Sequence, residues 1–265
     1  MRSATISDSW RALAALQMRV AASLILRETR ATFGTSHLGY LWAIITPVAS
    51  IVLLTVIFTY AARHPPFGTS LALFFATGII MLQLVLRLAE SLMTAVEANR
   101  ALLAYPPIKR TDVLFARAIL IVLTYLVIAG VIYGGLIALG MATPPAHLED
   151  VLFAFVAASL LGTGMGLINA MLLNRWDSWR RIAPILTKPL FFISGVFFVP
   201  DYLPPQIIEW LQWNPVLHAI EWTREGYYPG YESQVLDKTF LLLTSLILVF
   251  IGLAAERLTR RNGGL

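Results

Sequence analysis

Long apolar runs alternate with short polar connections along almost the whole chain. Six runs stand out, at about residues 38–61, 70–92, 112–140, 149–173, 182–199 and 238–255. A helix needs about 20 mainly apolar residues to cross the hydrocarbon core of a bilayer, and most of these runs reach that length. The pattern predicts an all-α polytopic membrane protein with six transmembrane helices, built as one domain over residues 1–265 with the six-span bundle at 38–256.

A different pattern precedes the first run. Between about residues 7 and 33, apolar and basic side chains lie mainly on opposite sides of a helix. The apolar side holds Trp10, Leu13, Leu16, Val20 and Leu24, and the basic side holds Arg11, Arg19, Arg27 and Arg30. We therefore expect residues 1–37 to carry an amphipathic helix at the membrane surface, with its arginines among anionic head groups. The alternative is a helix that faces solvent, and the tryptophan-led apolar side argues against it.

The segment between the fifth and sixth runs is also apolar, but prolines interrupt it. Pro200, Pro204 and Pro205 prevent a helix from continuing, because proline lacks the backbone N–H that the helix needs. Apolar residues then recur at helical spacing over about 205–213 and 215–225. This pattern predicts two short re-entrant helices, since broken backbone at membrane depth must be surrounded by protein or line a water-filled cavity. An amphipathic loop on the outer leaflet is the alternative.

Composition and charge support a membrane protein and orient it. Apolar residue types make up 58% of the chain and charged types 13%, against about 25% charged in soluble domains. If the six spans alternate, one side of the membrane holds only Arg63, Arg224 and Lys238 as basic residues, and the opposite connections hold most of the others. The basic side is expected to be cytoplasmic, which places both termini inside. The net charge of +5 is then a topology signal, and no nucleic-acid partner is expected.

Motifs of catalysis are missing from the sequence. It contains no G-x-x-x-x-G-K-[ST] loop, so ATP and Mg²⁺ would have to be bound by a partner. It has no cysteine, and its four histidines lack the spacing of metal ligands. No catalytic residue, metal site or cofactor is therefore predicted in this chain, although scattered carboxylates leave a membrane enzyme open.

Three basic residues, Arg87, Arg117 and Lys188, lie inside apolar segments. Charges there are costly unless they are paired or hydrated, so each is a candidate for lining a substrate passage suited to anions. Tyr40 and Trp42 are further candidates, because aromatic rings could stack on sugars. The alternatives are ion pairing or snorkelling near the cytoplasmic boundary for the basic residues, and packing or interfacial anchoring for the rings.

Three segments of the sequence resemble a known family. LRETRATFGTSHLGYLWAIITPV, LLAYPPIKRTDVLFARAI and KPLFFISGVFFVPDYLP…WNPVLHAIEWTREGYYPGY are similar to the capsular polysaccharide export permeases of bacterial ABC transporters. O-antigen export permeases are related to these. The resemblance implies a homodimer of six-span subunits in the inner membrane, each bound to a separate cytoplasmic ATPase.

The resemblance also implies roles for particular residues. An N-terminal gate helix at about 9–33 would admit the lipid anchor of an anionic glycan through Arg19, Arg27 and Arg30. A helix at about 97–105 would couple to the ATPase through Glu97, Asn99, Arg100 and Leu103. The re-entrant helices would form an outer gate with Trp213, Asn214, Pro215, Glu221 and Arg224.

The expected function is export of lipid-linked capsular polysaccharide, with periplasmic and outer-membrane proteins carrying the polymer onward. The alternatives are an ABC exporter of O-antigen, teichoic acid or a drug, and a membrane enzyme that acts on lipid-linked glycans.

Overall fold

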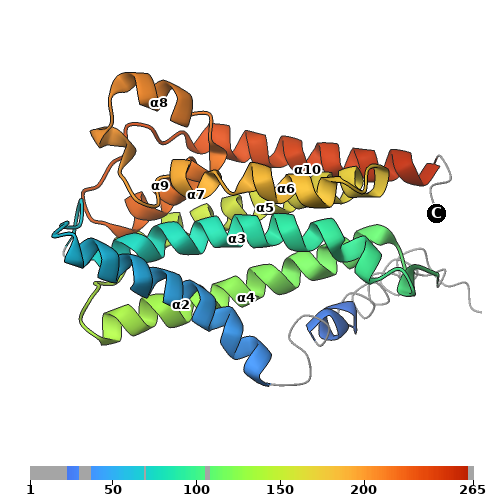
Figure 1. Cartoon of the computed structure of the whole chain (residues 1–265), viewed down its shortest axis with the longest axis horizontal. Coiled ribbons are helices and arrows are strands. Elements are labelled where there is room, and N and C mark those ends of the chain that lie inside the picture. The colour runs from blue at the N-terminus through green and yellow to red at the C-terminus, as the bar shows by residue number, and fades with distance from the viewer. Residues whose placement is uncertain (1–22, 30–36, 69, 105–107, 262–265) are drawn as a thin grey trace, which may run out of the picture.

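A computed structural model describes residues 23–29, 37–68, 70–104 and 108–261 of the chain. The regular elements in these ranges are helices, and the longest ones run along one common direction as an elongated bundle (Figure 1). Residues 23–29 form a short helical piece, called here the N-terminal segment. The all-helical prediction is confirmed for the described residues.

Among the described residues, five helices are long and apolar enough to cross a membrane. They are α2 (His37–Tyr60), α3 (Leu71–Ala98), α4 (Arg110–Ala138), α5 (Leu148–Arg175) and α10 (Lys238–Arg261). Their positions agree with five of the six predicted spans. A clear start signal is present at α3, where the Ser70 hydroxyl accepts a hydrogen bond from the backbone N–H of Leu73 and satisfies a donor that the first turn leaves free.

The centre of the bundle is α3, which packs against α5 at very short range. A Cβ atom added to Gly162 would lie 2.9 Å from the carbonyl oxygen of Val85, and one added to Gly166 would lie 2.8 Å from that of Leu88. On the opposite side of α5, Gly164 meets the backbone of α10 in the same way. The glycines at 162, 164 and 166 therefore let α3 and α10 approach α5 closely from two sides.

The predicted fifth span at 182–199 is not one continuous helix. It is divided into α6 (Trp179–Thr187) and α7 (Leu190–Ile193), with Lys188 and Pro189 between them. Pro189 has no N–H to continue the hydrogen bonding of α6. Gly195 then adopts a positive φ of 81° and turns the chain. The α6–α7 segment still runs along the bundle in Figure 1.

The two short helices expected after this segment are present as α8 (Pro205–Leu211) and α9 (Pro215–Tyr227). Their surroundings differ. α8 has no buried residue, whereas most of α9 is buried, against α5, α3 and α10. Two single 3₁₀ turns, η1 (Leu102–Ala104) and η2 (Pro200–Tyr202), complete the described elements. In Figure 1, α8 and α9 lie at one end of the bundle and the N-terminal segment lies at the other.

Candidate functional site

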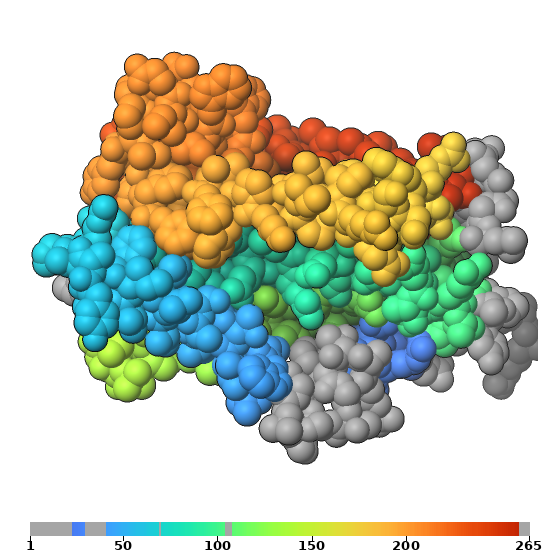
Figure 2. All heavy atoms as spheres, viewed as in Figure 1, coloured from blue at the N-terminus to red at the C-terminus, as the bar shows by residue number. Residues whose placement is uncertain are grey.

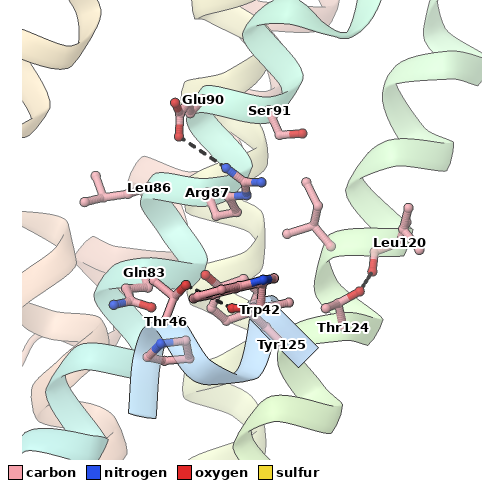
Figure 3. A pocket seen from close by; sticks show the side chains of 13 residues that line it. Trp42, Thr46, Gln83, Leu86, Arg87, Glu90, Ser91, Leu120, Thr124 and Tyr125 are labelled. Atoms are coloured by element: carbon pink, nitrogen blue, oxygen red, sulfur yellow. Dashed lines mark hydrogen bonds and ion pairs between the residues drawn. The ribbon is translucent and has the colours of Figure 1, made fainter. Parts of the chain in front are cut away.

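A hollow of about 520 Å³ opens on one side of α3, between α2 and α4. Its polar lining includes Thr46 from α2, Gln83 and Arg87 from α3, and Tyr125 from α4. Trp42 of α2 projects into it and is 65% exposed. Figure 3 shows the side chains of these three helices around the space. The hollow thus combines a cation, neutral polar groups and an aromatic ring.

Arg87 and Glu90 lie at the edge of this hollow. Arg87 Nη1 is 3.6 Å from Glu90 Oε2, and their side chains are 53% and 66% exposed (Figure 3). Charges on a membrane-spanning helix need a partner or water, and both of these side chains line the hollow. An anionic group of a ligand in the hollow can therefore take the place of Glu90 beside the guanidinium of Arg87.

A second cavity of about 180 Å³ lies beside the first, between α3, α5 and α6. Lys188, at the break between α6 and α7, lines it and is exposed. Leu86 and Glu90 line both cavities. The structure therefore brings Arg87 and Lys188 to two cavities that share Glu90. This surface of α3 is visible between α2 and the α6–α7 segment in Figure 2.

The structure places Arg117 elsewhere, in a buried ion pair. Its Nη2 and Nε atoms lie 2.6 and 2.7 Å from Glu28 Oε2. The second oxygen of Glu28 accepts a hydrogen bond of 2.5 Å from the side-chain amide of Asn99. We call Glu28, Asn99 and Arg117 the inner cluster. Arg117 lines neither of the two cavities. The structure therefore shows the alternative for this residue, an ion pair, in place of a role in the passage.

The inner cluster lies at the end of α3 that was expected to couple to an ATPase. A separate helix at 97–105 is not found in the described part, because α3 continues through Ala98 and ends at Asn99. A turn and η1 follow. Glu97 and Arg100 are exposed and Leu103 is half-buried, so these three side chains are accessible to a partner. Asn99 is 3% exposed and points inward.

The predicted gate arginines are only partly described. Arg27 is exposed and donates a hydrogen bond of 2.8 Å from Nη1 to the side-chain oxygen of Asn99. Arg19 and Arg30 fall outside the described residues, as does the side chain of Tyr40. The N-terminal segment is therefore tied to α3 through both Arg27 and Glu28.

At the other end of the bundle, Glu221 and Arg224 of α9 form a fully buried ion pair. Arg224 Nη1 is 2.8 Å from Glu221 Oε1 and also donates to the carbonyl oxygen of Phe198 at 3.2 Å. Its guanidinium lies 4.1 Å from the ring centre of Phe74, and the Tyr231 hydroxyl donates to Glu221 Oε2 at 2.5 Å. We call Glu221, Arg224, Tyr231 and Phe74 the outer cluster. Its packing makes it part of the protein core.

The remaining predicted outer residues divide between the core and the surface. Asn214 caps α9, because its side-chain oxygen accepts a hydrogen bond of 3.0 Å from the N–H of Val216, and Pro215 occupies the first helical position. The amide nitrogen of Asn214 also donates to the Ser194 hydroxyl at 2.9 Å. Trp213 is 70% exposed. The prolines and Asn214 therefore shape the hairpin, and Trp213 faces outward.

Sequence reasoning missed Glu28, the residue on which the inner cluster depends. A signal was present: Glu28 lies four residues after Leu24 and thus on its apolar side of the helix. Both are buried in the structure. A carboxylate on the apolar side of a basic helix requires a cationic partner, and Arg117 is that partner.

Comparison with known proteins identifies the family. A family model described as ABC-2 type transporter matches residues 20–228. The polysialic acid transport protein KpsM of Escherichia coli is 34% identical over 238 residues, which cover 89% of this chain and 91% of that protein. The capsule polysaccharide export inner-membrane proteins CtrC of Neisseria meningitidis and BexB of Haemophilus influenzae are 24% and 25% identical, each over 90% of both chains. This multi-pass membrane protein therefore belongs to the ABC-2 type transporter family.

Proposed function

We propose that the chain is the permease subunit of an ABC transporter that exports lipid-linked capsular polysaccharide across the inner membrane. The observation that carries this proposal is the match to capsule export proteins along nine-tenths of their length and of this chain. The sequence has no phosphate-binding loop, so hydrolysis of ATP, with its Mg²⁺, belongs to a separate cytoplasmic subunit. This chain is then a transport subunit without catalysis of its own.

The proposed topology has six crossings within one transmembrane domain. The α6–α7 segment is the fifth crossing, and the break at Lys188–Pro189 lies within it. The α8–α9 hairpin is re-entrant from the outer side. Both termini are cytoplasmic, which is supported by the basic residues in the connections near the N-terminal segment and the C-terminal end of α10.

We place the substrate passage between two copies of the chain, along the α3 surface between α2 and the α6–α7 segment. Within one chain α2 is the least buried of the five long helices, so most of its apolar surface, including Val52, Leu53 and Ile57, is left for lipid or for a second copy of the chain. Arg87 and Lys188 would attract an anionic glycan, and Trp42 and Tyr40 would stack on its sugars. Conduction needs several weak sites of this kind, because a single tight site would hold the polymer.

The cytoplasmic ATPase is proposed to dock on the turn that follows α3, through Glu97, Arg100 and Leu103. The amphipathic N-terminal region, with Arg19, Arg27 and Arg30, would receive the anionic lipid anchor. Periplasmic and outer-membrane proteins would accept the glycan beyond the outer hairpin.

The test is reconstitution. Vesicles that contain the chain and an ABC ATPase subunit from the same organism are loaded with lipid-linked capsular glycan, and the glycan that reaches the opposite leaflet is measured with and without ATP. We expect ATP-dependent translocation that disappears when residues 97–103 are replaced by a flexible linker. Transport of O-antigen, teichoic acid or a drug in place of capsular glycan would reassign the substrate. Turnover of lipid-linked glycan without any ATPase would overturn the proposal in favour of a membrane enzyme.

A further inference from the structure

The inner cluster joins three parts of the chain that are distant in sequence. Glu28 lies in the N-terminal segment, Asn99 ends α3, and Arg117 lies on α4. Arg117 also donates a hydrogen bond of 3.3 Å from Nη1 to the carbonyl oxygen of Ser91 on α3. Glu28 is therefore held by α3 and α4 together.

The contact between Glu28 and Arg117 is buried. Glu28 is 2% exposed and Arg117 is 8% exposed. A carboxylate at such a position is tolerated only with a complete set of partners, because an unpaired buried charge is strongly destabilising. Both carboxylate oxygens of Glu28 are occupied, one by Asn99 and the other by Arg117. The N-terminal segment cannot shift over α3 without breaking these bonds.

The same end of α3 is linked to α6 as well. Glu97, in the last turn of α3, forms an ion pair with Arg180 in the first turn of α6. Both side chains are about half exposed, so this contact is weaker than the buried one. The end of α3 thus contacts the N-terminal segment through buried hydrogen bonds and contacts α6 through a half-exposed ion pair.

We propose that Glu28 is the positioning residue that makes the N-terminal segment move with the end of α3 when the ATPase subunit engages it. The inference rests on the proposed function, since it assumes that a nucleotide-driven partner pushes on the turn after α3. Asn99 then acts within the chain, passing that displacement to Glu28, while Glu97, Arg100 and Leu103 meet the partner. A movement driven by ATP hydrolysis is thus transmitted to the N-terminal segment through the hydrogen bonds of the Glu28 carboxylate.

The decisive variant is E28Q/R117M, which removes both charges and leaves no unpaired ion in the core. It is compared with wild type, with the conservative variant R117K, and with E209Q, which removes an exposed carboxylate of α8. Each is reconstituted with the ATPase subunit, and glycan translocated per ATP hydrolysed is measured. The chain has no cysteine, so a spin label at L26C, an exposed position of the N-terminal segment, reports the mobility of that segment in each background.

We expect E28Q/R117M to assemble and hydrolyse ATP, while glycan translocated per ATP falls about fivefold or more, the lower range of measured coupling effects. The L26C label should become more mobile, R117K should give intermediate coupling, and E209Q should match wild type. Unchanged glycan per ATP in E28Q/R117M would overturn the inference alone. Failure of that variant to assemble would also overturn it, by showing a role in folding only. If wild type shows no ATP-driven translocation, the proposed function itself fails.

Discussion

The inner and outer clusters are both buried arginine–glutamate pairs, yet they hold different kinds of structure together. Glu28 and Arg117 are separated by 89 positions and belong to different elements. Glu221 and Arg224 are three positions apart on one helix, and aromatic side chains surround them. The outer cluster is therefore part of a single packed block, whereas the inner cluster joins the short N-terminal segment to α3 and α4.

This contrast predicts that the outer cluster matters most for global stability. In R224L the carboxylate of Glu221, which is fully buried, loses its cation. We expect a loss of about 3–5 kcal/mol in the free energy of unfolding. Thermal unfolding of the purified protein in detergent measures the change. E232Q, at an exposed position, is the control, and an R224L protein as stable as that control would refute the description of the outer cluster as core.

Helix α3 contributes a residue to each cluster, Phe74 near its start and Asn99 at its end, and it packs closely on α5. G162A places a methyl group 2.9 Å from the backbone of α3, and overpacking of this kind costs about 1–3 kcal/mol. The loss should appear as a lower unfolding temperature. G134A is the matched control, because nothing lies within 4 Å of the added Cβ atom there, and equal losses in the two variants would argue against close helix packing at Gly162.

For the inner cluster we expect a smaller global effect. In E28Q the N-terminal segment can detach, which exposes Arg117 to water. The free energy of unfolding of the bundle should therefore fall by only about 1 kcal/mol, the central value for single substitutions. Hydrogen exchange should instead become faster locally, over residues 23–29 and the end of α3. A cooperative loss as large as that of R224L would show that the inner cluster is core as well, and the contrast would fail.

The five long helices and the short α8 and α9 could be predicted within a few residues, because each depends on a local pattern of apolar residues and prolines. The break at Lys188–Pro189 was also readable in principle, but the apolar run around it hid the effect of Pro189. The end of α3 was not predictable from local pattern, since Asn99 is fixed by Glu28 from another part of the chain. The same holds for Arg117, whose partner is distant in sequence. Long-range pairing, and not helix formation, was the missing information.

The last expected effect appears only at acid pH and concerns the contact between the α8–α9 hairpin and the start of α10. His218 Nδ1 accepts a hydrogen bond of 3.0 Å from the N–H of Asp237, so Nε2 carries the proton and donates to the carbonyl oxygen of Gln212 at 2.8 Å. Burial lowers the pKa of His218 below its usual 6.5, although the nearby acids Asp237 and Glu221 act in the opposite direction. The folded protein therefore holds this imidazole neutral.

As pH falls below 6.5, unfolded chains bind a proton at His218 that the folded protein resists, so the folded state loses stability until the lowered pKa is reached. One proton limits this slope to about 1.4 kcal/mol per pH unit. H218N keeps an oxygen to accept from Asp237 but does not titrate. Unfolding temperatures of both proteins between pH 7.5 and pH 5 should diverge only on the acid side, with wild type losing more. Parallel curves would mean that a neutral His218 does not stabilise the contact between the α8–α9 hairpin and α10.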